Sequence, residues 1–214
     1  MIRKLGLIVV CLLVVPLAEA AEVGLVTSLA GTVTRQDVKA PGNVLKPFVK
    51  VWDGDRLTLG DAARVQIVYF DGGRQETWAG TGAITIGESE SVVKKGKLMP
   101  EIKVLPALLV KQLAKTPGAD GNLRAGMVRS RSIPPPKGTE LAEQNYAELR
   151  ANAPAEDRSP ELYLLSSYLE LREFDKLDAL MQQLKTSAPA DAEIEALCAL
   201  YARAAEIARA GAKQ

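Results

Sequence analysis

The sequence has no histidine among its 214 residues, and aromatic side chains make up only 5% of it. Without histidine there is no Ser-His-Asp or Cys-His catalytic pair and no metal site with a histidine ligand. The formal net charge is +1, which gives no overall attraction to nucleic acid, so we expect no nucleic-acid partner. With so few aromatic residues, the core is expected to consist of Val, Leu, Ile and Ala.

The first twenty residues have the pattern of an export leader. Arg3 and Lys4 precede an apolar run at 5–17, which is too short to span a membrane comfortably. Ala18 and Ala20 occupy the two positions that a signal peptidase reads. We therefore predict cleavage after Ala20 and a periplasmic protein that does not span the membrane after cleavage. Retention of this segment as an uncleaved anchor is the alternative.

Cysteine is also scarce, because Cys198 is the only one after residue 20. A lone cysteine cannot form an internal disulfide, although export would permit one. Cys198 lies in the apolar helical pattern ALCALYA, which favours a buried side chain over a reactive thiol.

Residues 23–93 are organised as short alternating runs separated by Gly, Asp and Pro. Many short strands with turn residues between them predict a β-sandwich-like module or a small barrel. The run at 63–70 is apolar on both faces near its end, which predicts a central strand covered on both sides. Asp71, Gly72 and Gly73 then supply the residues of a tight turn, so 63–78 is predicted to be a β-hairpin.

The pattern changes after this region. Residues 106–115 predict a short amphipathic helix that begins at a proline, and 123–132 could form one more strand. The prolines at 133–138 predict a linker between a β domain at 21–132 and a helical domain at 139–214. The helical domain is expected to contain four helices, at 139–152, 160–171, 175–187 and 191–210.

Charge divides at the same boundary. Residues 21–138 contain 17 Lys and Arg against 11 Asp and Glu, a net charge of +6, whereas 139–214 contain 8 against 14, a net charge of −6. Residues 94–137 are the most basic part of the chain. We favour a structural interpretation, in which they form a solvated face or dock on the acidic helices of the same chain. The alternative is a surface for an anionic envelope polymer or lipid headgroup. Its candidate residues are Lys94, Lys95, Lys97, Arg129 and Arg131.

The β region resembles a FecR-type periplasmic domain. The match covers about a third of the chain, and Gly73 replaces the serine that usually follows Asp-Gly. Members that regulate iron uptake carry a cytoplasmic arm before this domain, whereas here a leader-like segment precedes it, so direct control of a sigma factor is not expected. The matching residues are Gly31-Thr-Val, Trp52-Asp-Gly-Asp-Arg-Leu, Leu59-Gly60, Ala63-Arg-Val-Gln-Ile-Val-Tyr-Phe-Asp-Gly-Gly and Ile84-Thr-Ile.

The helical region resembles a tetratricopeptide repeat. One repeat and the second helix of a preceding unit are recognisable, and the last helix resembles a cap with Cys198 and Ala199 at its packing positions. Such arrays usually need three units, so the helices are expected to lean on the β module. The matching residues are Ala142, Tyr146, Leu149, Pro154, Leu164, Leu165, Tyr168, Phe174, Leu177, Met181, Leu184 and Pro189.

Two patterns were considered as enzyme signals. Ser91-Val-Val-Lys94 matches S-x-x-K, but that chemistry needs a helix and this stretch follows a strand pattern. Asp53, Asp55 and Asp71 are better explained as turn residues, although a spatial pair of carboxylates for a hydrolase stays open. No catalytic residue, metal or cofactor is predicted.

These observations predict an exported, non-enzymatic binding or scaffolding protein of the cell envelope. The resemblance to tetratricopeptide repeats implies that the helices bind an envelope protein. The candidate partner-binding residues are Tyr146, Tyr163 and Tyr201, whereas core packing is favoured for Tyr168. The alternative function is a soluble periplasmic sensor that passes ligand occupancy to a membrane signalling partner.

Overall fold

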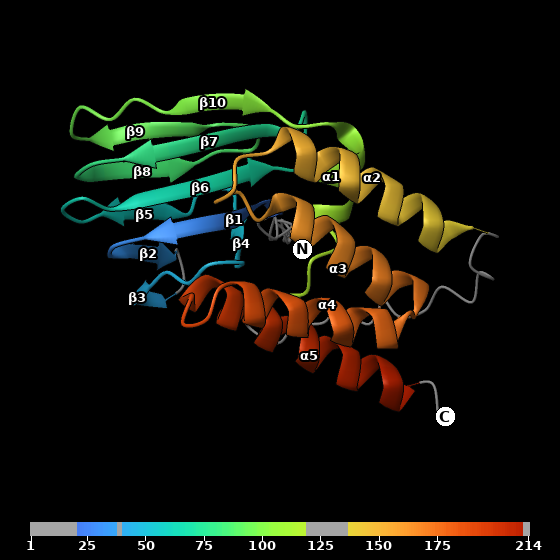
Figure 1. Cartoon of the computed structure of the whole chain (residues 1–214). Coiled ribbons are helices and arrows are strands. Elements are labelled where there is room, and N and C mark those ends of the chain that lie inside the picture. Colours follow the sequence, from blue (N-terminus) through green and yellow to red (C-terminus); the bar gives the residue numbers. More distant parts are fainter. Residues whose placement is uncertain (1–20, 38–39, 119–136, 212–214) are drawn as a thin grey trace, which may run out of the picture.

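The computed structural model describes residues 21–37, 40–118 and 137–211. Within these ranges ten strands come first and five helices follow, and the four longer helices lie together beside the strands (Figure 1). This order confirms the expected β region followed by an α region. The strands are β1 (Glu22–Ala30), β2 (Val33–Asp37), β3 (Ala40–Val44), β4 (Lys50–Trp52), β5 (Arg56–Leu59), β6 (Arg64–Tyr69), β7 (Arg74–Ala79), β8 (Gly82–Ile86), β9 (Ser91–Lys95) and β10 (Glu101–Val104).

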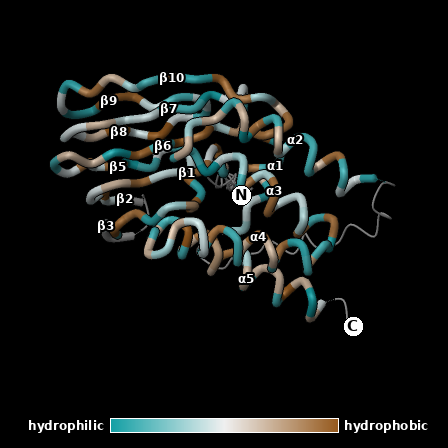
Figure 2. Tube along the Cα trace, in the orientation of Figure 1, coloured by the Kyte–Doolittle hydropathy of each residue, from teal (hydrophilic) through white to brown (hydrophobic). Residues whose placement is uncertain are grey.

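The strands form two antiparallel five-stranded sheets that pack as a sandwich. Sheet A has the order β10-β7-β6-β1-β4, and sheet B has the order β3-β2-β5-β8-β9. Hydrophobic and hydrophilic residues alternate along these strands (Figure 2), which places alternate side chains on one face. Val65, Ile67 and Trp78 of sheet A meet Leu57 and Ile84 of sheet B in one buried cluster.

Strand β6 lies at the centre of sheet A, between β7 and β1. Its residues Val65 and Ile67 belong to the cluster between the sheets, whereas Val68 belongs to a second cluster that sheet A shares with the helices. All three side chains are fully buried. The prediction of a central strand covered on both sides is confirmed.

The predicted hairpin is also confirmed. Strands β6 and β7 pair antiparallel, with Val68 opposite Gln75, and the chain reverses at Asp71, Gly72 and Gly73. Both glycines have left-handed backbone, with φ of +69° and +66°, which suits a residue without a Cβ.

The helices are α1 (Ala107–Leu113), α2 (Gly138–Asn152), α3 (Ser159–Leu171), α4 (Phe174–Ser187) and α5 (Ala192–Gly211). The last four begin and end within one residue of the expected bounds, and α1 lies inside the range predicted for the short helix. Each of α2 to α4 packs against the next helix in the chain, and α1 packs against α3. The linker expected at 133–138 lies outside the described residues up to 136, and Gly138 already begins α2.

A second hydrophobic cluster joins sheet A to the helices. It contains Leu25 of β1, Phe48, Val68 of β6 and Leu113 of α1, together with buried residues of α2 to α5. The amide of Gln112 also donates to the Ser167 hydroxyl at 3.1 Å, which ties α1 to α3 inside this layer. The molecule therefore has three layers, with sheet A between sheet B and the helices, and the helices do lean on the β module.

Four strands were not predicted individually, namely β1, β3, β9 and β10. Strand β1 lies inside sheet A and is buried over Val23 to Thr27, so its residues do not alternate between apolar and polar. The other three lie at the outer edge of a sheet. An edge strand needs less apolar alternation than a central one, and charged residues are common there, so β9 (SVVKK) and β10 (EIKV) carry a weak strand signal. The possible strand at 123–132 lies outside the described residues.

The two turn glycines give a matched test of backbone strain and space. A Cβ on Gly73 would lie 2.8 Å from the Leu105 carbonyl oxygen and 2.9 Å from Val110 Cγ2, whereas a Cβ on Gly72 would meet nothing within 4 Å. Since both residues have similar φ, Gly73→Ala should lower the free energy of unfolding by about 1–3 kcal/mol more than Gly72→Ala. Urea unfolding followed by tryptophan fluorescence measures both, and equal losses would show that the turn needs only the backbone geometry.

Candidate functional site

The carboxylates singled out in the sequence are turn residues in the structure. Asp55 is buried, accepts the backbone N–H of Trp52 at 2.9 Å and pairs with Arg35 at 3.0 Å. The Arg35 guanidinium in turn stacks over the Trp52 ring, 4.5 Å from its centroid. Asp53 and Asp71 are exposed at turns. Asp55 thus closes the β4–β5 turn.

A second buried carboxylate, Glu76, was not predicted from the sequence and is fully buried on β7. It accepts hydrogen bonds from Arg74 Nε at 2.7 Å, from Trp78 Nε1 at 2.9 Å and from the backbone N–H of Ser91 at 3.2 Å. The Ser91 hydroxyl lies 2.6 Å from the Tyr69 hydroxyl, and burial raises the pKa of Tyr69 well above its usual range. These contacts join sheets A and B and satisfy the buried charge, which is a structural role.

The S-x-x-K match is confirmed as a coincidence, because Ser91 and Lys94 lie on strand β9. Residues three apart on a strand point to opposite faces and cannot act together. Cys198 is buried, as predicted, and burial raises the pKa of its thiol.

The structure places most of the candidate tyrosines in the core. Tyr163 and Tyr201 are 4% and 0% exposed, so they are not available for partner contact without unfolding. The Tyr163 hydroxyl accepts from Asn145 Nδ2 at 3.0 Å, and burial raises the pKa of Tyr201 to about 12. Tyr168 is buried, as favoured from the sequence. Only Tyr146 is partly exposed, and its hydroxyl donates to Glu161 at 3.3 Å.

The candidate lysines lie at one edge of the β module. Lys94 and Lys95 are exposed on β9, the edge strand of sheet B, and Lys97 is exposed just after it. Lysines at an edge commonly prevent pairing with another sheet. Arg129 and Arg131 lie outside the described residues.

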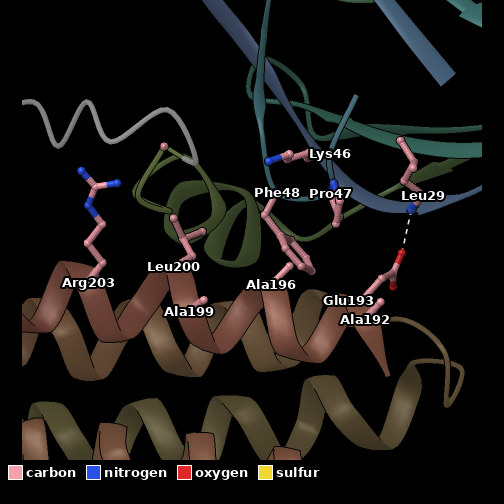
Figure 3. Close-up of a pocket in the computed structure, with 11 residues that line it drawn as sticks. Leu29, Lys46, Pro47, Phe48, Ala192, Glu193, Ala196, Ala199, Leu200 and Arg203 are labelled. Carbon is pink, nitrogen blue, oxygen red and sulfur yellow. Dashed lines mark hydrogen bonds between the residues drawn. The ribbon is translucent and has the colours of Figure 1, made fainter. Parts of the chain in front are cut away.

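A groove of about 490 Å³ lies between the β module and the helices, beside α5 (Figure 3). We call it the junction groove. Its volume lies within the range of small-molecule sites. It is lined by Leu29, Lys46, Pro47, Phe48, Gly118, Ala192, Glu193, Ala196, Ala199, Leu200 and Arg203.

One wall of the junction groove is the face of α5 that is turned toward the β module. Ala192, Ala196, Ala199 and Arg203 recur every three or four residues, so they share one face of the helix. The small side chains of the three alanines leave the space open above the helix, as Figure 3 shows. Ala199, expected at a packing position, is exposed in this wall instead.

The opposite wall is the segment between β3 and β4. Phe48 has a φ of +60°, which is unusual for a bulky side chain and persists only where the surroundings enforce it. Its ring is 1% exposed and packs with the helices, and its N–H donates to the Val26 carbonyl oxygen at 2.8 Å. Burial of the ring therefore fixes this wall of the groove.

Charges are unequally distributed along the junction groove. At one end Glu193 accepts hydrogen bonds from the Ser28 hydroxyl at 3.0 Å and from the Leu29 N–H at 2.7 Å. Arg203 lies at the other end, and Lys46 lies between the two ends beside Phe48; both cations are exposed (Figure 3). The spacing of alanines on the last helix was the one sequence signal available for this site. Nothing in the sequence indicated that the segment before β4 would form the opposite wall.

Comparison with family models, curated proteins and solved structures found no match for this chain. Among the described residues, no helix combines the length and apolar character needed to cross a bilayer. In the same part of the chain, no group of three or more Cys, Asp and Glu residues is arranged to hold a metal ion.

Glu193 is predicted to hold α5 against the β module. Glu193→Ala removes both hydrogen bonds to β1 and should lower the free energy of unfolding by about 1–3 kcal/mol. Glu195→Ala is the matched control, because Glu195 lies in the same first helical turn but is exposed. Thermal or urea unfolding of the two variants compares them, and equal stability would mean that the contact with β1 contributes nothing.

Proposed function

We propose that the protein is an exported, non-enzymatic binding or scaffolding protein of a bacterial cell envelope, with the junction groove as its binding site. The observation that carries this proposal is the groove itself, which has the volume of a ligand site and walls from both parts of the chain. The leader-like pattern of residues 1–20 supports export.

The chemistry of the groove favours a ligand with an apolar chain and an anionic end. Ala196, Ala199 and Leu200 offer an apolar wall, which gains from contact with an apolar chain. The carboxylate of Glu193 is already engaged by β1, whereas the cations Lys46 and Arg203 line the groove and are exposed. An anionic group would therefore be oriented toward these two cations.

The finer assignments of the two parts also belong to this proposal. We assign the sandwich to the FecR-type domain and α2 to α5 to a tetratricopeptide-like array that binds an envelope protein. Helices α2 to α5 pack in succession and run alternately in opposite directions (Figure 1), which supports the second assignment. Of the tyrosines considered for this contact, Tyr146 is the one with an accessible position.

A sensor function is the second candidate, and one feature of the groove favours it. A ligand in the groove would touch both the β module and α5, so its binding would be coupled to the contact between them. If the protein is a sensor, ligand should change the capture of an envelope partner, whereas a simple binding protein should capture it equally with and without ligand.

Ligand binding is tested with a pair of single-chain amphiphiles that differ in charge. Dodecanoate should raise the melting temperature of the exported protein by several degrees at saturating concentration, because it binds the folded state. Dodecyltrimethylammonium, with the same chain and a positive end, should bind at least about tenfold more weakly because it faces Lys46 and Arg203. Isothermal titration calorimetry measures both affinities below their micelle concentrations.

Two variants in the groove and one control variant outside it locate the site. Ala196→Trp should fill the groove and abolish dodecanoate binding, whereas Ala210→Trp, an exposed alanine near the end of the same helix, should leave it unchanged. Arg203→Glu should reduce or reverse the preference for the anion without affecting the fold, since Arg203 is exposed. Equal binding by all three variants would place the site elsewhere.

Export is tested by intact mass. Protein recovered from the periplasm should begin at Ala21, and Ala20→Arg should block cleavage because the peptidase requires a small residue there. A periplasmic or membrane-bound product that retains residues 1–20 would instead support the anchored form.

A further inference from the structure

Strand β10 is an apolar edge that, within the described residues, has a neighbouring strand on one side only. It pairs with β7 at the border of sheet A and is the outermost strand in Figure 1. Ile102 and Val104 are 47% and 74% exposed, and Met99 just before them is 87% exposed. Exposed apolar residues on an unpaired edge are typical of strands that pair with another chain.

The backbone of β10 has hydrogen-bonding groups directed outward. The N–H of Leu105 donates to the Gly73 carbonyl oxygen at 2.9 Å, which continues the regular register between β10 and β7. In an antiparallel ladder, residues that bond to one neighbour alternate with residues that point the other way. Glu101 and Lys103 therefore bond toward β7, and the N–H and C=O groups of Ile102 and Val104 point toward the free side.

The neighbouring edge of the sandwich differs from β10. Strand β9 ends sheet B on the same side of the molecule (Figure 1) and carries the exposed Lys94 and Lys95, with Lys97 following. These lysines oppose strand addition at β9. Residues 101–104 contain one acid and one base, so they carry no net charge that would oppose a partner.

The sequence of β10 is complementary to itself. In an antiparallel pair of two copies centred on Ile102, each Glu101 lies opposite the Lys103 of the other copy. Both side chains are more than half exposed and already approach each other at 3.1 Å within one chain. Opposite charges directly across a strand pair stabilise it, and like charges destabilise it. A pairing centred one residue further along, on Lys103, would place Lys103 opposite the Lys103 of the other copy, and these like charges would destabilise it.

We propose that β10 is a self-association surface, through which two copies of the chain pair their sheets A around a two-fold axis at Ile102. The two Ile102 residues then form a hydrogen-bonded pair, because their outward N–H and C=O groups meet at the axis. Val104 of each copy lies opposite Pro100 of the other, and proline has no N–H to donate. The pairing is therefore short and the dimer dissociates reversibly.

This surface lies on a different strand from the junction groove, and the proposal does not depend on ligand binding. The exported protein should show a weight-average mass that rises from one copy toward two copies with increasing concentration. Sedimentation equilibrium or light scattering in the micromolar to sub-millimolar range measures this rise. A single-copy mass throughout this range would overturn the proposal.

Charge reversal distinguishes self-pairing from other modes of association. Lys103→Glu places Glu opposite Glu twice, and Glu101→Lys places Lys opposite Lys twice, so each variant should dimerise about tenfold more weakly or worse. An equimolar mixture of the two variants restores opposite charges in both pairs and should recover the dimer. The double variant with both substitutions should also dimerise like the original protein.

The charge-reversal residues are exposed, so the variants are expected to keep the original melting temperature. Lys97→Glu, just after the neighbouring edge strand β9, is the matched control and should leave the association constant unchanged within about twofold. Weakening in the two single variants without recovery in the mixture would exclude pairing in this register. Unchanged association in Lys103→Glu would place the contact elsewhere.

Discussion

The rest of the structure depends on the burial of sheet A on both of its faces. Its central strands β6 and β1 contribute side chains to the cluster between the sheets and to the cluster with the helices. Burying a Val, Leu or Ile side chain stabilises the folded state by about 1.5–3 kcal/mol. Sheet B and the helical layer both pack against β6 and β1, so neither completes its hydrophobic core unless sheet A is in place.

The same constraint creates the candidate site. Helix α5 is held at the end of β1 by Glu193, and Phe48 is held in the core despite its left-handed backbone. Between these two fixed points the small residues of α5 do not fill the space. A ligand site at a junction of layers follows from imperfect packing between rigid elements, which is where such sites are commonly found.

The sequence predicted the parts of the fold whose periodicity is strong. The alternating run of β6 and the glycines after it identified the hairpin, and the apolar spacing from residue 139 onward identified the helices within one residue. Three edge strands were missed because residues such as Lys95 and Ile102 are exposed and show no buried face, as in a loop. Strand β1 was missed for the opposite reason, because it is buried on both faces and shows no alternation. The junction groove and the Glu76 network were missed for another reason. They bring together residues far apart in the chain, and a local pattern carries no information about which elements will meet.

Cys198 gives the helical layer an intrinsic reporter. It is the only cysteine after residue 20, lies 1% exposed on α5, and its sulfur approaches the Met181 carbonyl oxygen of α4 at 3.6 Å. A thiol reagent therefore reaches it only when α4 and α5 separate. In a chain that begins after residue 20, the rate of thiol labelling consequently measures the opening of this helix pair, whereas the fluorescence of Trp52 and Trp78 follows the sandwich. Two independent signals from one chain thus distinguish local opening of the helices from global unfolding.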